Sequence, residues 1–109
     1  MAAIIVTKNT ELMQRVIDEI KTCYDPEIPV DVWELGLIYE LHLDDDANLK
    51  VIMTLTSPNC PAAESLPAEI ENKLKLLQGI TAVELKLTFE PSWEKEMMSE
   101  VAQLELGFM

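Results

Sequence analysis

Residues 37–55 read LIYELHLDDDANLKVIMTL, and this stretch decides the fold. Apolar side chains occupy every second position in 37–43 and again in 49–55, which is typical of strands with one buried face. An acidic five-residue stretch, DDDAN at 44–48, lies between the two alternating runs. The stretch therefore predicts a β-hairpin, and the rest of the chain must pack around it.

Two helical patterns flank this hairpin. Apolar residues recur at helical spacing over 11–24, which predicts a first amphipathic helix. A second helical pattern covers 62–77 and contains Pro67. That proline predicts either a helix that kinks there, or a short first turn followed by a main helix that is capped near Ser65 and has Pro67 at its first position.

The alternation returns over residues 83–89 and predicts a third strand. A helical crossover joins it to the second strand, so these two strands should run parallel. After Pro91, apolar residues predict one or two short C-terminal helices. The order α-β-β-α-β-α predicts one α+β domain over residues 1–109, with a small mixed three-stranded sheet and helices on one face.

Composition narrows the class of protein. The 109 residues carry 20 Asp and Glu against 8 Lys and Arg, a net charge of −12. Nucleic-acid and anionic membrane surfaces both require clustered basic residues, so both partners are disfavoured. The N-terminus lacks a signal-peptide pattern, and the two cysteines lack CxxC spacing. We expect a cytoplasmic protein with free thiols.

The segment TLTSPNCP, residues 54–61, contains the first candidate site. Cys60 follows a predicted strand and precedes a predicted helix, whose positive end can stabilise a thiolate. Thr56 and Ser57 add hydroxyl groups that could bind sulfur or a ligand. The alternative is that Cys60 is a small apolar core residue.

The loop DPEIP, residues 25–29, is the second candidate site, because its prolines would fix the carboxylates of Asp25 and Glu27. Alternatively, Asp25 or Asp31 caps a turn. Cys23 belongs to the apolar face of the first helix and is predicted to be core.

Two further groups have mainly structural interpretations. His42 alternates with the apolar residues of its strand, which predicts a solvated or partly covered histidine rather than a ligand or general base. Trp93, Met97 and Met98 form an apolar group that predicts core or lid packing, with a partner-docking patch as the alternative.

In combination, these motifs resemble the MIP18 family, also called the DUF59 domain, to which the bacterial SufT proteins belong. The resemblance runs from about Thr10 to Gly107. It rests on an opening DPE, LGL before a strand, the turn TLTSPNCP, GITAV before the last strand, and PSW followed by MSE and LG.

This resemblance implies an iron–sulfur-cluster assembly-like α/β fold and an accessory, carrier or targeting role in iron–sulfur protein maturation, rather than a turnover enzyme. The family's cysteine falls on Cys60, its acidic pair on Asp25 and Glu27, and its hydroxyl pair on Thr56 and Ser57. These groups cluster around one pocket in family members. The implied partners are assembly scaffolds or carriers and client apoproteins.

One well-placed cysteine limits the chemistry, because an iron–sulfur cluster usually takes about four protein ligands. We therefore expect no permanent cofactor. Transient contact of Cys60 with iron or a cluster would need a two-fold homodimer or a mixed complex. Two other classes stay open: a metal-independent adaptor that docks through residues 93–98, and a thiol enzyme that uses Cys60. The enzyme is disfavoured because His42 has no evident pairing with that cysteine.

Overall fold

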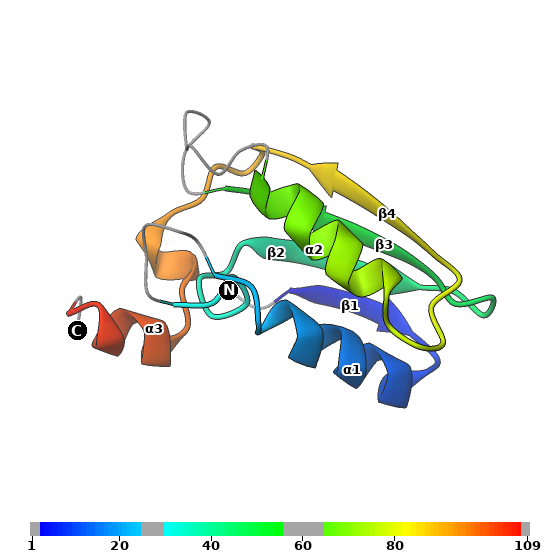
Figure 1. Cartoon of the computed structure of the whole chain (residues 1–109). Helices are drawn as coiled ribbons and strands as arrows, with labels where there is room; N and C mark the ends of the chain where they lie inside the picture. The colour runs from blue at the N-terminus through cyan, green and yellow to red at the C-terminus, as the bar shows by residue number, and fades with distance from the viewer. Residues whose placement is uncertain (1–2, 25–29, 56–64, 108–109) are drawn as a thin grey trace.

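The computed structural model describes residues 3–24, 30–55 and 65–107 (Figure 1). Its elements in chain order are β1 (Ile4–Thr7), α1 (Thr10–Ile20), β2 (Ile38–Leu43), β3 (Asn48–Met53), α2 (Ser65–Lys75), β4 (Ala82–Leu87), the 3-10 helix η2 (Lys95–Met97) and α3 (Glu100–Glu105).

The strands of the described residues form one four-stranded sheet in the order β1-β2-β3-β4. The hairpin β2–β3 is antiparallel, and β3 and β4 are parallel, as predicted. The prediction of three strands is wrong, because β1 adds to the sheet parallel to β2. Its apolar residues Ile4, Ile5 and Val6 are consecutive rather than alternating, so the pattern that identified the other strands is absent.

Helices α1 and α2 lie side by side on one face of the sheet (Figure 1). The alternate strand residues on that face are buried, and they include Leu41, Val51 and Met53, none of which is exposed at all. The opposite, open face carries half-buried and charged side chains, among them His42 and Lys50. The two-layer prediction is confirmed, and none of the described helices is long and apolar enough to cross a membrane.

A side-chain cap explains where α1 begins, and Pro67 lies near the described start of α2. The side chain of Asn9 accepts a hydrogen bond from the Leu12 amide at 3.0 Å and caps α1. Helix α2 is described from Ser65 onward, and Pro67 is its third described residue. Because the residues before Ser65 lie outside the described part of the chain, both interpretations of Pro67 stay open.

Candidate functional site

The five predicted pocket residues lie outside the described residues: Asp25, Glu27, Thr56, Ser57 and Cys60. Their clustering, and the position of Cys60 beside a helix terminus, stay predictions. The described residues that flank these two segments show where each segment leaves and rejoins the fold.

Both segments are anchored at the same end of the sheet. The amide of Val32 donates to the carbonyl of Cys23 at 2.9 Å, which ties the two sides of the first segment together. The amide of Thr54 donates to the carbonyl of Leu37 at 2.8 Å, where β3 ends and β2 is about to begin. Helix α2 begins at this end as well (Figure 1). The amide of Leu37 also donates to the carbonyl of Val32 at 3.2 Å, so the described anchors of the two segments are joined directly.

A turn that follows the first segment is held by Asp31. Its carboxylate accepts hydrogen bonds from the amides of Trp33 and Glu34, each at 3.1 Å. Burial raises the pKa of Asp31, although these amide hydrogen bonds act in the opposite direction. Asp31 therefore caps a turn, which was one of the two interpretations of the acidic residues in this region.

The C-terminal part of the chain packs against the residues between the two segments. The indole nitrogen of Trp93 donates to the carbonyl of Leu35 at 2.7 Å. The amide of Ser99 donates to the carbonyl of Glu34 at 2.9 Å, and the Ser99 hydroxyl also donates to the Glu34 carboxylate. We call Trp93, Met97 and Ser99 the C-terminal clamp, because all three contact residues 34–39.

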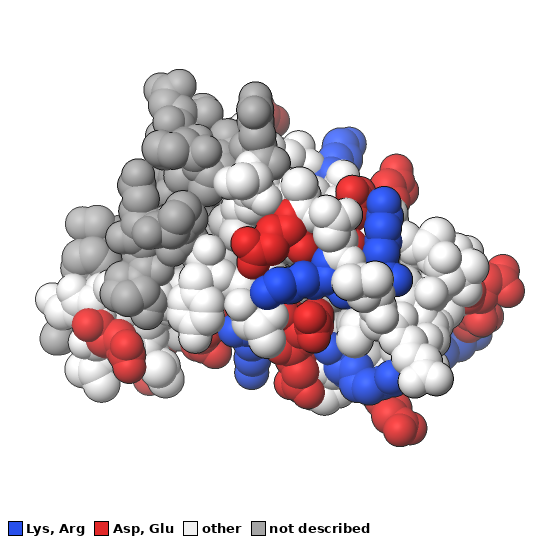
Figure 2. Space-filling model, in the orientation of Figure 1, with Lys and Arg blue, Asp and Glu red and all other residues white. Residues whose placement is uncertain are grey.

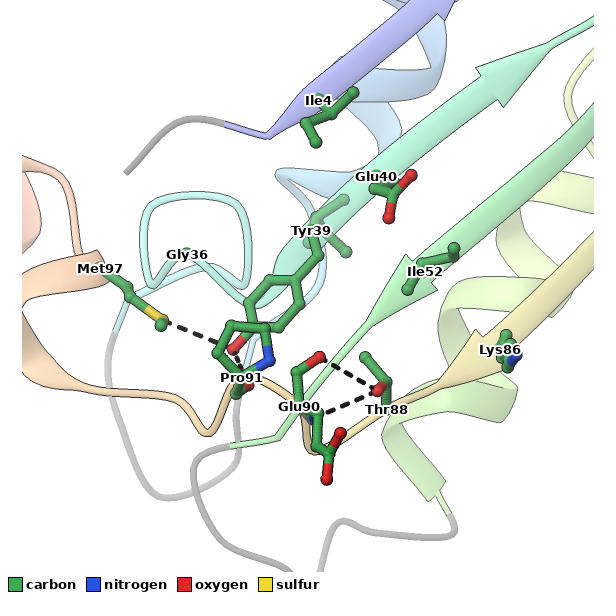
Figure 3. A pocket seen from close by; sticks show the side chains of 11 residues that line it. Ile4, Gly36, Tyr39, Glu40, Ile52, Lys86, Thr88, Glu90, Pro91 and Met97 are labelled. Atoms are coloured by element: carbon green, nitrogen blue, oxygen red, sulfur yellow. Dashed lines mark hydrogen bonds between the residues drawn. The ribbon is translucent and has the colours of Figure 1, made fainter.

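Tyr39 joins this arrangement from the start of β2. Its hydroxyl donates to the carbonyl of Pro91 at 2.7 Å and lies 3.5 Å from the Met97 sulfur (Figure 3). Burial raises the pKa of the Tyr39 phenol, and the nearby Glu94 carboxylate acts in the same direction. The phenol thus stays protonated at neutral pH and acts as a structural donor.

These contacts change the interpretation of the predicted docking residues. Met98 is only 3% exposed and belongs to the hydrophobic core, so docking through Met98 is corrected: its side chain cannot reach a partner. Trp93 is half-buried and packs against the core, as the lid interpretation predicts. Sequence reasoning missed the clamp because its partners are 58 residues apart for Trp93 and Leu35, and 65 apart for Ser99 and Glu34. The motifs LGL and PSW marked both sides without indicating that they touch.

The two other titratable candidates are structural. Cys23 is a free, buried thiol, and burial raises its pKa, so it is the wrong kind of cysteine for a nucleophile or a metal ligand. His42 lies on the open face and forms a 2.8 Å contact with the Glu40 carboxylate. Both observations match the predictions for these residues.

Neither the charges of the helical face nor the grouping of possible metal ligands indicates a binding site among the described residues. Figure 2 shows the helical face, where lysine and arginine side chains lie between acidic ones, so no continuous basic surface forms there on the part of the chain that the structure describes. Within residues 3–24, 30–55 and 65–107, no three His, Cys, Asp or Glu side chains are grouped so that they could hold a metal ion.

A groove of about 410 Å³ crosses the open face beside the clamp (Figure 3). Its lining combines Ile4 of β1, Ile52 of β3 and Met97 with the carboxylates of Glu40 and Glu90. A second hollow of about 370 Å³ lies on the other side of β1. The groove reaches the end of the sheet that anchors the two segments, since Gly36, Ile38 and Thr88 are among its lining residues.

The described fold defines a class: a small α+β domain whose C-terminal segment packs against residues 34–39. Comparison with known proteins gives the family. The family model described as "Iron-sulfur cluster assembly protein" matches residues 13–86. The chain belongs to this family.

Individual relatives agree with this assignment. The chain is 47% identical over 104 residues to an Fe-S protein maturation auxiliary factor of Porphyromonas gingivalis, covering 93% of this chain and 99% of the relative. It is 36% identical over 83 residues to the Fe-S protein maturation auxiliary factor SufT of Staphylococcus aureus, covering 76% and 94%. The crystal structure of a DUF59 domain from Bacillus anthracis superposes with a TM-score of 0.84 at 29% identity, covering 92% of this chain and 95% of that one.

Proposed function

We propose that this chain is an accessory factor in the maturation of iron–sulfur proteins, which assembles, carries or delivers clusters to client apoproteins. The observation that carries the proposal is the similarity, over almost the full length of both chains, to a protein named as an Fe-S protein maturation auxiliary factor. Its partners are then assembly scaffolds or carriers and client apoproteins. The iron or cluster is cargo rather than a resident cofactor.

Within this proposal Cys60 contacts the cargo, Asp25 and Glu27 form the pocket wall, and Thr56 and Ser57 support the sulfur. The common anchoring of both segments at one end of the sheet supports this assignment. Because an iron–sulfur cluster usually needs about four protein ligands, one such thiolate binds only as part of a larger assembly. That assembly is a two-fold homodimer or a mixed complex with a scaffold or client.

The proposal is tested in the host by deleting the gene and measuring the activity of an iron–sulfur dehydratase under iron limitation. The deletion is complemented with the wild type, Cys60→Ala or Cys23→Ala. The Cys23→Ala variant is the matched control, because it also removes one thiol, but from the core. Immunoblots check that each variant accumulates.

We expect the deletion to lower dehydratase activity, and the wild type and Cys23→Ala to restore it while Cys60→Ala does not. Rescue by Cys60→Ala would instead favour a metal-independent adaptor that bridges assembly machinery and clients. An unchanged dehydratase activity in the deletion strain would contradict the maturation role itself.

A further inference from the structure

Strand β1 is the outer strand on one side of the sheet, and its free edge is apolar. Among the described residues, β2 alone pairs with it in the sheet. Ile4, Ile5 and Val6 are 58%, 43% and 51% exposed, and the strand carries no charged residue. An exposed edge strand presents unpaired N–H and C=O groups and can accept another strand.

The opposite edge is different. Strand β4 carries Glu84 and Lys86, and both are exposed. Charged side chains on an edge strand discourage further pairing. The chain therefore protects one edge of its sheet and leaves the other ready to pair.

We propose that β1 binds an extended segment of a partner protein, apolar at its centre and basic at its flanks, which adds to the sheet as a fifth strand. An added strand projects its side chains alternately to the two faces of the sheet. Ile4 pairs with Glu40 of the open face, and Ile5 pairs with the buried Leu41. The two neighbouring strand residues thus face opposite sides.

A hollow lies beside β1 on each of these sides. The groove of about 410 Å³ on the open face includes Ile4 (Figure 3), whereas the hollow of about 370 Å³ includes Ile5 together with Trp33. Strand addition gains affinity from main-chain hydrogen bonds and specificity from pockets for alternate side chains. Two hollows at successive positions are suited to two successive apolar side chains of the added strand.

The charges around β1 determine the flanks of the partner segment. Glu34 and Glu40 border the hollows near the start of the strand, whereas the lysine that lines the groove, Lys86, lies on β4 at the opposite edge of the sheet. Near its end, the carboxylates of Glu11, Asp44 and Asp45 share a surface depression with a single lysine, Lys8. Lysine or arginine on both sides of the apolar centre would complement these carboxylates, whereas acidic flanks would be repelled.

A second copy of this chain fits this edge poorly. Each copy carries a net charge of −12, and both ends of β1 are bordered by acids. The strand is 4 residues long, and pairing so short a strand buries much less than the roughly 1,200–2,000 Å² of a stable interface. A flexible partner segment avoids bringing two acidic domains together.

Binding is tested on the purified full-length chain with a fluorescein-labelled peptide, KTVIVTK, by anisotropy and by ¹⁵N NMR. Main-chain pairing predicts binding with a dissociation constant below about 1 mM and amide shifts that concentrate on β1 and its neighbour β2. Peptide ETVIVTE should bind at least about tenfold more weakly. N-methylation of the alternate residues of KTVIVTK whose amides face β1 should abolish binding, because it removes the peptide N–H groups that donate to the edge strand.

The protein variants Val6→Lys and Leu76→Lys form a matched pair, since each places one lysine at an exposed apolar position, 51% and 86% exposed respectively. Val6→Lys should weaken KTVIVTK binding at least about tenfold, and Leu76→Lys should change it less than about twofold. No binding at 1 mM, equal binding of the N-methylated peptide, or a dimer that Val6→Lys disrupts would overturn the proposal. The test uses no iron–sulfur readout, so its failure leaves the maturation role intact.

Discussion

Gly36 packs so closely against Met97 that a β-carbon at position 36 would overlap the Met97 carbonyl group. The backbone of Gly36 also has a φ of 77°, in the left-handed region that favours glycine. The glycine of the LGL motif is therefore required for two reasons: it allows the turn before β2, and it leaves room for the backbone of η2 to pack against it.

Replacing Gly36 should lower the free energy of unfolding by more than the strain of its left-handed backbone conformation alone. Gly107 has a similar φ of 78°, but nothing lies within 4 Å of its β-carbon position, so Gly107→Ala is the matched control. We expect Gly107→Ala to cost about 1 kcal/mol of unfolding free energy, and Gly36→Ala about 2–4 kcal/mol because the overlap adds to the strain. Urea unfolding of both variants measures the difference, and equal losses would show that the Met97 contact relaxes freely.

Urea unfolding should also measure how much the hydrogen bond from Trp93 to the Leu35 carbonyl contributes to stability. Trp93→Phe keeps an aromatic ring but leaves the carbonyl of a fully buried residue without this donor. We expect a loss of about 1–2 kcal/mol in unfolding free energy. Trp33→Phe is the control, because the Trp33 side chain donates no hydrogen bond among the described contacts. A loss in Trp93→Phe no larger than in the control would contradict a stabilising clamp.

The elements that could be predicted from sequence are those whose periodicity is strong. The hairpin of β2 and β3 alternates from Glu40 onward, with an irregularity between Ile38 and Glu40 at its start, and α1 places buried residues such as Val16 and Ile20 on one face. Strand β1 lacks that signal, because a short apolar run specifies burial without specifying a period. Its place in the sheet depends on pairing with β2, more than thirty residues later.

The candidate site could be predicted only in part. Chemistry and family resemblance single out Cys60, Asp25 and Glu27, which lie outside the described residues. The contacts that hold residues 34–39 against the C-terminal clamp were not visible in the sequence, because a long-range contact such as Ser99 to Glu34 has no local pattern. The turn at Asp31 could be predicted, because aspartate side chains often cap turns and Asp31 does so here.

The two cysteines should differ in reactivity. Burial raises the pKa of the Cys23 thiol and closes it to reagents, since it is only 1% exposed. In a Cys60→Ala background, N-ethylmaleimide should therefore modify folded Cys23 at least about a hundredfold more slowly than the same protein in urea. Modification at the rate of a free cysteine in the folded protein would contradict the buried position.

The raised pKa of Cys23 also gives the direction of a pH effect. Because the thiol ionises less readily in the folded chain than in the unfolded one, its contribution to stability is fully present below the ordinary thiol pKa and is lost as the pH rises through the folded pKa. Cys23→Ala should therefore lose less stability than the wild type between neutral and alkaline pH. Urea midpoints across that range compare the two, and parallel curves would contradict the linkage.

The acidic loop of the hairpin should give the opposite pH dependence, because its contribution to stability is lost as the pH falls. The Asp44 carboxylate accepts hydrogen bonds from the amide and side chain of Asn48 at 2.9 and 3.1 Å and from the Asp46 amide at 2.9 Å, and these bonds lower the pKa of Asp44. A depressed folded pKa stabilises the fold above the ordinary pKa, and this stabilisation is lost as the pH falls through the folded value. Asp44→Asn removes the titrating group, so its stability deficit relative to the wild type should be largest near pH 7 and shrink toward pH 3. Asp46→Asn removes the same charge without removing an acceptor of these bonds, and an equal deficit with the same pH dependence in both variants would show that Asp44 contributes only its charge.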